Sequence, residues 1–298
     1  MTIVDIMLPY YGPVDLMRET VRSVLAQDDP HWRLTVVDDG YPDASIPGWF
    51  AALGEPRVRY VRNERNLGAN RNYQKCLGLI EHELAVIMGA DDVMLPNYVG
   101  TVREAYRAHP DVAMLQPGVR IIDERGRHTC GLVDNAKRRL YAPKVLGTRT
   151  MSGEEAAVSL LRGNWLYFPS LCWRSAAIKE IGFREGLDVV QDLGLVLDLI
   201  YRGEKLLVDS TVCFHYRRHS ASDSSWRALA GTRFVEERRF FLDTAKRAAE
   251  LGWSRAARVA RTHLSSRLNA LTLLPSAIRA HHRTGVSNLT KHVLGVGD

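Results

Sequence analysis

The sequence predicts an α/β protein with a mostly parallel sheet flanked by helices and a helical C-terminal region. Apolar strand-like runs alternate with segments of helical spacing through the first 120 residues, which is typical of a parallel sheet. Two acidic pairs, Asp38-Asp39 and Asp91-Asp92, directly follow two of the strand-like runs. Because ligands of such sheets bind beyond the carboxyl ends of the strands, both pairs indicate one shared binding edge.

The individual elements are distinguished by the period of their apolar residues. Continuous or alternating apolar runs predict strands, whereas spacings of three and four residues predict helices, such as the one opened by Asp15. Strands are predicted at residues 2–9, 32–38, 57–63, 84–88 and 112–117. Helices are predicted at 15–25, 68–81, 98–108, 152–161 and 191–201, and continuously beyond Trp226 with breaks at Gly252 and Pro275.

Composition limits the class of protein. Of the 298 residues, 46% are hydrophobic and 25% charged, as in ordinary globular proteins, and no apolar run approaches the ~18 residues of a membrane span. The N-terminal apolar run contains Asp5 and has no basic residue before it, so we expect a strand rather than a signal peptide and a cytoplasmic location. Four cysteines without a C-x-x-C pair predict reduced, buried thiols.

The C-terminal region carries most of the positive charge. Residues 225–298 hold 13 Lys and Arg against 5 Asp and Glu, whereas the whole chain has a net charge of only +6. Arg255, Arg258 and Arg261 alternate there with apolar residues, which predicts a basic amphipathic helix. Such a helix either contacts an anionic membrane surface peripherally or covers the rest of the protein with its charges in water. The near-neutral body argues against nucleic-acid binding.

The acidic pairs have both chemical and structural interpretations. Adjacent carboxylates at a strand end suit a hard divalent cation that shares oxygen ligands with phosphates, as proposed for Asp91-Asp92. A carboxylate of Asp38-Asp39 could accept a hydrogen bond from a base or a ribose. Either pair could instead form an ordinary turn or helix cap. The glycines of G-x-G-x-x-G and of the phosphate loop are absent, which disfavours dinucleotide and P-loop sites.

Several segments together resemble glycosyltransferase family 2, whose members have the Rossmann-like GT-A fold. The resemblance covers most of residues 2–120 and continues more loosely to residue 222. The matching segments are Pro9-Tyr10-Tyr11, 23–27 (SVLAQ, like S-x-x-x-Q), Asp38-Asp39-Gly40, 66–72 (NLGANRN, like N-x-G-x-x-x-A-R-N), Asp91-Asp92 (like D-x-D), Gln191-Asp192 (like E-D) and 216–222 (YRRHSAS, like Y-R-x-H-x-x-S).

The resemblance implies a role for each matching residue. Residues 1–224 would form the catalytic domain, with a nucleotide-sugar half at 1–120 and an acceptor half at 121–224, followed by the basic helical region at 225–298. The nucleotide base would lie against Pro9, Tyr11 and Asp39, with Asn66 and Arg71 closing the pocket and Asp91 contacting the ribose.

Metal and base assignments follow from the same resemblance. Asp92, together with His219, would bind Mg²⁺ or Mn²⁺ at the donor diphosphate, where a cation neutralises the developing negative charge. Asp192 would be the general base that removes the acceptor hydroxyl proton, with Asp188 as a rival. The sequence departs from the pattern at Gly89, which replaces an acid, and at Gln191, which replaces a glutamate. His219 could also be an ordinary surface histidine, and Arg217 and Arg218 could neutralise phosphate.

The predicted function is therefore a metal-dependent, inverting transfer of a sugar from a UDP-, dTDP- or GDP-sugar to a hydroxyl group. The acceptor would be a glycan, a lipid-linked saccharide or a small molecule, and Trp165 is a candidate acceptor contact unless it is a core residue. Two alternatives are a sugar nucleotidyltransferase, which lacks its expected Gly-rich loop here, and a non-catalytic scaffold that binds nucleotide sugars, suggested by Gly89 and Gln191.

Overall fold

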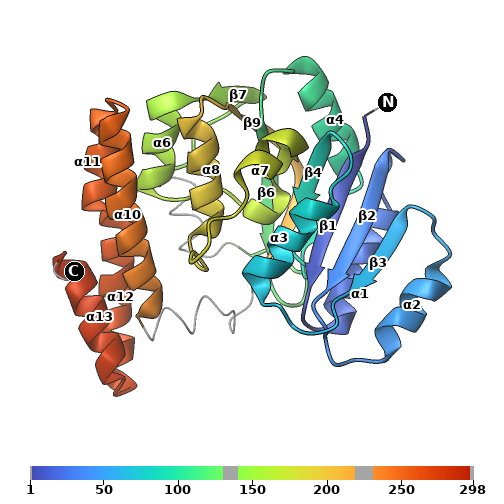
Figure 1. Ribbon diagram of the computed structural model, residues 1–298, viewed down its shortest axis with the longest axis horizontal. Helices are drawn as coiled ribbons and strands as arrows, with labels where there is room; N and C mark the ends of the chain where they lie inside the picture. Colours follow the sequence, from blue (N-terminus) through green and yellow to red (C-terminus); the bar gives the residue numbers. More distant parts are fainter. Residues whose placement is uncertain (1, 130–139, 219–230, 296–298) are drawn as a thin grey trace.

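A single twisted sheet organises the protein. The computed structural model describes residues 2–129, 140–218 and 231–295. Within these residues, nine strands form one sheet in the order β3-β2-β1-β4-β8-β6-β9-β5, and β7 pairs with β9 off this path. Helices cover both faces of the sheet, and the last four helices stand together at one end of it (Figure 1). The predicted α/β class with a helical C-terminal region is confirmed.

The first half of the chain builds the parallel part of the sheet. Strands β1 (Val4–Tyr10), β2 (Trp32–Asp38), β3 (Val58–Arg62) and β4 (Leu84–Ile87) pair in parallel. Helices α1 (Val14–Leu25) and α3 (Ala69–Leu79) connect strands of this set, and α4 (Tyr98–Ala108) follows it. All seven elements match predicted ones. Helix α2 (Ser45–Leu53) was not predicted, because Pro47 and Gly48 inside it are typical of a turn.

The second half adds strands of both directions. Strand β6 (Met114–Ile122) runs parallel to β9 (Leu206–Arg217), while β8 (Cys172–Arg174) joins β4 to β6 in antiparallel pairing. Two short strands, β5 (Val93–Met94) and β7 (Thr148–Met151), pair antiparallel with β9. The helical elements are α6 (Gly153–Arg162), the 3₁₀ turn η1 (Phe168–Ser170), α7 (Ser175–Ile181) and α8 (Gln191–Tyr201).

Hydrophobic clusters on the two faces of the sheet hold these layers together. Strand β1 shows the alternation directly: Val4, Ile6 and Leu8 pack into the cluster that includes α1 and α4, whereas Met7 points into the cluster formed with α3, α6 and α8. The thiols of Cys76, Cys172 and Cys213 are buried and free, as predicted, and Cys130 lies outside the described residues.

The C-terminal helices are packed on the body of the protein. Helices α10 (Thr232–Glu250) and α11 (Ser254–Thr262) contribute Phe240, Phe241 and several alanines to the cluster that also contains α6 and α8. Helices α12 (Leu264–Arg279) and α13 (Arg283–Leu294) form a smaller cluster with Phe234 of α10. None of the helices in the described parts of the chain is long and apolar enough to cross a membrane.

One predicted helix break is wrong. A break does occur at Gly252, whose φ of 74° suits glycine, but Pro275 lies inside α12. Helix α12 instead begins after His263, which has a left-handed φ of 31°, and ends before His281 and His282. A proline in a helix removes one backbone hydrogen bond, and here the packing of Ala270 and Ala277 against α10 and α13 holds the helix together across it.

Candidate functional site

The candidate site lies at the edge where the parallel strands end. Strand β1 ends at Tyr10, β2 at Asp38 and β4 at Ile87, and their parallel register brings these ends side by side. The Asp38-Asp39 and Asp91-Asp92 pairs therefore share one edge, as predicted from the sequence.

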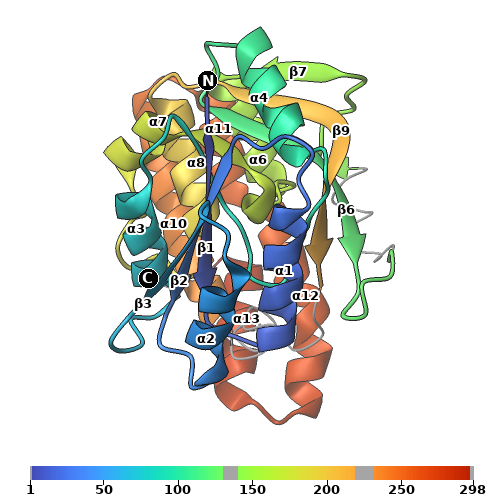
Figure 2. The same ribbon diagram turned by 90° about the vertical axis from the view of Figure 1, so that its right-hand side faces the viewer.

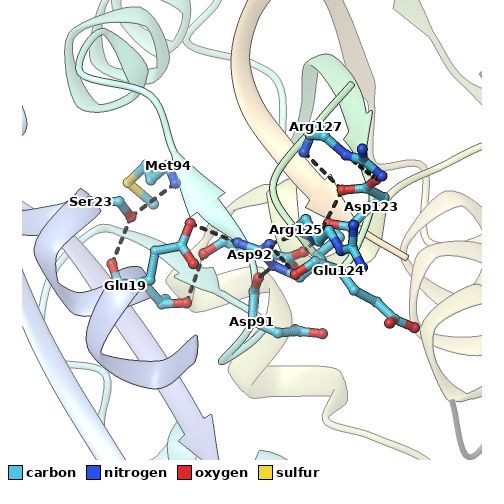
Figure 3. A network of polar contacts seen from close by, with 11 residues as sticks. Glu19, Ser23, Asp91, Asp92, Met94, Asp123, Glu124, Arg125 and Arg127 are labelled. Atoms are coloured by element: carbon cyan, nitrogen blue, oxygen red, sulfur yellow. Dashed lines mark hydrogen bonds and ion pairs between the residues drawn. The ribbon is translucent and has the colours of Figure 1, made fainter. Parts of the chain in front are cut away.

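Helix α1 fixes the chain that follows the second acidic pair. The Thr20 hydroxyl donates to the Asp92 carbonyl at 2.7 Å, and the Met94 N–H donates to the Ser23 hydroxyl at 3.0 Å (Figure 3). The Gln27 amide donates to the Leu95 carbonyl at 2.7 Å and accepts from the Val99 N–H at 3.0 Å. The S-x-x-x-Q motif thus binds backbone groups of Met94, Leu95 and Val99, and Thr20 adds the Asp92 carbonyl.

Asp92 is a buried carboxyl group at this edge of the sheet. Its side chain is buried, with 1% of the residue exposed. Oδ1 accepts the Arg217 N–H at 2.8 Å, whereas Oδ2 is buried and has no hydrogen-bond partner among the described residues. Burial, and then the neighbouring Asp91 charge, raise the pKa of Asp92 well above its usual range.

Gly89 makes room for this carboxylate. A Cβ atom placed on Gly89 would lie 2.5 Å from Asp92 Oδ2 and 3.0 Å from Asp91 Oδ1. Glycine in place of an acid at position 89 therefore fits the structure, because both aspartates turn into the space that a side chain at this position would occupy.

Arg217 joins four segments around the acidic pair. Its guanidinium, 1% exposed, donates to the Asp91 carbonyl at 2.6 Å and pairs with Glu19 of α1 at 2.8 Å. It also donates to the carbonyls of Asp123 and Glu124 at 3.3 Å, in the turn that follows β6 (Figure 3). In the structure Arg217 therefore holds segments of the protein together, and its side chain is almost fully buried.

The Asp39 carboxylate organises the loop before α3. Oδ1 accepts from the Asn63 amide at 2.7 Å and the Leu67 N–H at 2.8 Å, and Oδ2 accepts from the Gly68 N–H at 3.0 Å. Gly68 has a φ of 84°, a conformation that favours glycine. The sequence did not reveal this structural use of Asp39, which is 2% exposed. One lone pair of Oδ2 stays available for a ligand.

The other predicted donor-binding residues surround this loop. Pro9 lies in β1 and is partly exposed, while Asn66 and Arg71 are exposed on the loop and on the first turn of α3. Tyr11 is 56% exposed, and its ring meets that of Tyr41 edge-on at 5.3 Å between centroids. Tyr41 was missed by the sequence analysis, although it directly follows the Asp-Asp-Gly turn.

Asp192 lies in the first turn of α8. Its Oδ2 accepts from the Asn164 amide at 3.2 Å, and its Oδ1 accepts from the Leu193 N–H at 2.7 Å. Beside it, the Gln191 Oε1 atom is buried, and none of the residues that the structure describes donates a hydrogen bond to it. The position that departs from the family's glutamate therefore offers an unused acceptor next to Asp192.

Tyr73 of α3 connects the two acidic regions. Burial is the largest cause that raises the pKa of the Tyr73 phenol, and the charges of Asp91, Asp92 and Asp192 raise it further. The Tyr73 phenol is therefore protonated at neutral pH and can donate a hydrogen bond.

A carboxylate of the C-terminal region supports the Asp192 turn. Glu236 Oε1 of α10 accepts the N–H groups of Asp188, Val189 and Val190 at 3.0, 2.7 and 3.0 Å. These are the residues that lead into α8, so the Glu236 carboxylate caps this turn, while the N-cap residue Val190 makes no side-chain cap of its own. Asp188, the rival base, is exposed on the same turn.

Two predicted site residues, Trp165 and His219, are not found at the candidate site. Trp165 is 5% exposed, packs in the core, and its indole N–H donates to the Ser159 hydroxyl at 3.1 Å, so its assignment as an acceptor contact is corrected to a core residue. His219 lies outside the described residues.

The buried carboxylate of Asp92 is the feature of this edge that fits a divalent cation. In the described parts of the chain, no group of three or more His, Cys, Asp or Glu side chains is placed to hold a metal ion. Asp92 nevertheless buries an ionisable oxygen that no residue in the described parts of the chain hydrogen-bonds, and a cation is a suitable partner for such an oxygen.

Comparison with known proteins places the chain among sugar-transferring enzymes. The family model described as Glycosyl transferase family 2 matches residues 5–162, just over half of the chain. An uncharacterized Mycobacterium tuberculosis protein, MT1568, is 27% identical over 253 residues, which cover 80% of this chain and 74% of the relative.

Two solved structures share the fold. Residues 1–349 of Staphylococcus aureus TarS, crystallised with UDP-GlcNAc, superpose with a TM-score of 0.62 at 14% identity, covering 99% of this chain and 92% of TarS 1–349. The mannosyltransferase PcManGT from Pyrobaculum calidifontis, in complex with GDP-Man and Mn²⁺, superposes with a TM-score of 0.58 at 14% identity, covering 98% and 85% of the two chains. Both similarities concern the GT-A fold.

Proposed function

The chain belongs to glycosyl transferase family 2, and from that premise we propose that it moves a sugar from a nucleoside diphosphate sugar to an acceptor hydroxyl by direct, inverting displacement. One observation carries the proposal: at the carboxyl edge of the parallel strands, Asp92 buries a carboxylate oxygen that no described residue hydrogen-bonds. Helix α3 joins this edge to the turn before Asp192, because the Asn70 amide donates to the Leu187 carbonyl at 2.8 Å.

On the donor side, the base would lie near the Tyr11 and Tyr41 rings, the Asp39 carboxylate and Arg71, with Asp91 toward the ribose. Asp92 would hold Mg²⁺ or Mn²⁺, which supplies charge neutralisation for the leaving diphosphate when bound. The complex of PcManGT with GDP-Man and Mn²⁺, a protein of the same fold, supports this choice of partners. Arg217 keeps the acidic turn in place from β9.

On the acceptor side, Asp192 would take the proton of the attacking hydroxyl. Asn164 orients its carboxylate, and the helix N-terminus at α8 favours its negative charge. Gln191 Oε1 and the Tyr73 phenol would hold neighbouring hydroxyl groups, one as acceptor and one as donor. These polar groups suit a glycan, a lipid-linked saccharide or another polyhydroxylated acceptor.

A donor panel tests the proposal. The melting temperature should rise with one class of UDP-, dTDP- or GDP-sugar in the presence of Mn²⁺, because a ligand at about 100 times its Kd stabilises the folded state by about 2.7 kcal/mol. The same donor should then be hydrolysed slowly, which is measured as release of nucleoside diphosphate. Binding without any release, in every donor and acceptor mixture, would instead support a non-catalytic scaffold.

Glu236 provides a second, independent expectation. Glu236→Leu removes the acceptor of three N–H groups before α8. Each buried N–H left without an acceptor costs roughly 1–3 kcal/mol. We therefore expect kcat for donor hydrolysis to fall about tenfold with an unchanged KM. Glu236→Gln retains an acceptor oxygen and should recover most of kcat. Asp243→Asn, an exposed change on the same helix, is the control. Equal kcat values in all three variants would show that the cap does not position Asp192.

A further inference from the structure

Helix α12 has two apolar faces, and only one of them is covered. Ala270 and Ala277, with the partly buried Leu273, pack against α10 and α13. On the opposite face Leu264, Leu268, Leu271 and Ile278 are 62%, 50%, 49% and 57% exposed. A surface helix normally exposes a polar face, so four large apolar side chains in one line mark a contact surface.

The exposed residues form one continuous stripe. Their spacing of four, three and seven residues, with exposed Pro275 in the gap, keeps them on one side of a helix. We name Leu264, Leu268, Leu271, Pro275 and Ile278 the α12 stripe.

The charge around the stripe has a single sign. From residue 251 to 297 the sequence contains seven Lys and Arg residues and no Asp or Glu. Arg261 precedes the stripe, Arg279 and Arg283 follow it, and all three are exposed. A second copy of the chain on this face would bring like charges together, which opposes a dimer. An apolar stripe with basic ends instead complements a surface that is anionic outside and apolar beneath.

The position of α12 suits such a surface. In both views β1 starts at the N-terminus at the top, and α12 and α13 extend at the opposite end (Figures 1 and 2). Strands β1, β2 and β4 run in parallel toward that end, where their carboxyl ends carry the acidic pairs. Helix α12 and the candidate site therefore lie toward the same end of the molecule.

We propose that the α12 stripe docks the protein on an anionic lipid bilayer, with the leucines inserted among the acyl chains and the arginines on the headgroups. This surface is distinct from the residues of the proposed transfer reaction, and docking needs no donor. It would give a lipid-linked acceptor access to the site from the bilayer.

Flotation of the full chain with vesicles tests the proposal. We expect binding to phosphatidylcholine vesicles that contain phosphatidylglycerol and little binding to pure phosphatidylcholine. Leu268→Gln/Leu271→Gln should weaken partitioning on the order of tenfold or more, because both side chains lose apolar burial. Arg279→Glu and Arg283→Glu should each weaken it about fivefold or more, and salt should reduce wild-type binding. Asn269→Gln/Thr272→Gln, exposed polar changes on the same helix, should bind like wild type.

Three results would overturn the proposal. The first is failure of the wild-type chain to float with the vesicles, and the second is flotation of the leucine variant equal to that of wild type. The third is a dimer in size-exclusion chromatography that Leu268→Gln/Leu271→Gln dissociates, which would assign the α12 stripe to a second copy of the chain. Donor hydrolysis without vesicles should be the same in all these variants. That measurement verifies folding and separates a failure of docking from a failure of the proposed reaction.

Discussion

Asp192→Asn is expected to lower kcat for transfer by about 10²–10⁴-fold, the range that a positioned general base contributes. The asparagine keeps the size of the side chain and a carbonyl oxygen for the Asn164 amide, but it cannot take a proton at neutral pH. Donor affinity should stay within about twofold of wild type, because the donor is proposed to bind at the other acidic pair. The measurement is kcat and donor Kd, by calorimetry, in the same preparations.

Asp188→Asn is the matched control for this prediction. Asp188 lies four residues before Asp192, is exposed, and its N–H is held by the same Glu236 cap. We expect its activity to resemble wild type. The reverse pattern, an active Asp192→Asn and an inactive Asp188→Asn, would assign the base to Asp188.

The parallel core was predictable because its signals are local. The strands β1, β2 and β4 are short, mostly buried and apolar runs between turn residues, and their length and flanking residues identify them as strands. The strands β5, β7, β8 and β9 were not predicted. The first three have four residues or fewer and exist through antiparallel pairing with a distant strand, and the apolar run of β9 is interrupted by Asp209, Ser210 and Thr211. Such pairing leaves no period in the sequence.

In the candidate site, too, local features were predictable and contacts between distant residues were not. The types of residue at the edge, two acidic pairs and an Asp192 at a helix start, were readable as motifs. The uses of individual side chains were not, because their partners are far apart in sequence. Arg217 reads as a phosphate contact beside Arg218 and His219, yet its partners are Glu19 and the Asp91 and Asp123 carbonyls. Glu236 gave no sequence signal, since nothing in α10 itself indicates the N–H groups of residues 188–190.

Asp92→Asn is expected to have opposite effects on stability and activity. Donor hydrolysis with Mn²⁺ should fall by about 10²-fold or more, since the proposed cation site loses its buried charge. With a chelator at neutral pH, the same variant should be more stable than wild type by about 1 kcal/mol, because it no longer carries a buried carboxyl group whose ionisation the fold opposes. Asp15→Asn, an exposed change on α1, should alter neither property.

The pH dependence of that gain in stability follows from the raised pKa of Asp92. A folded-state pKa above the unfolded value means that the unfolded state loses the proton first, so wild-type stability without metal falls as pH rises above about 4 toward the folded pKa. The variant has no such group, and the difference in melting temperature between the two should be small at pH 4 and grow toward pH 7. Adding Mn²⁺ at pH 7 should raise the melting temperature of wild type alone, reversing the order. A metal-induced rise that is equal in both proteins would place the cation elsewhere and remove Asp92 from its role.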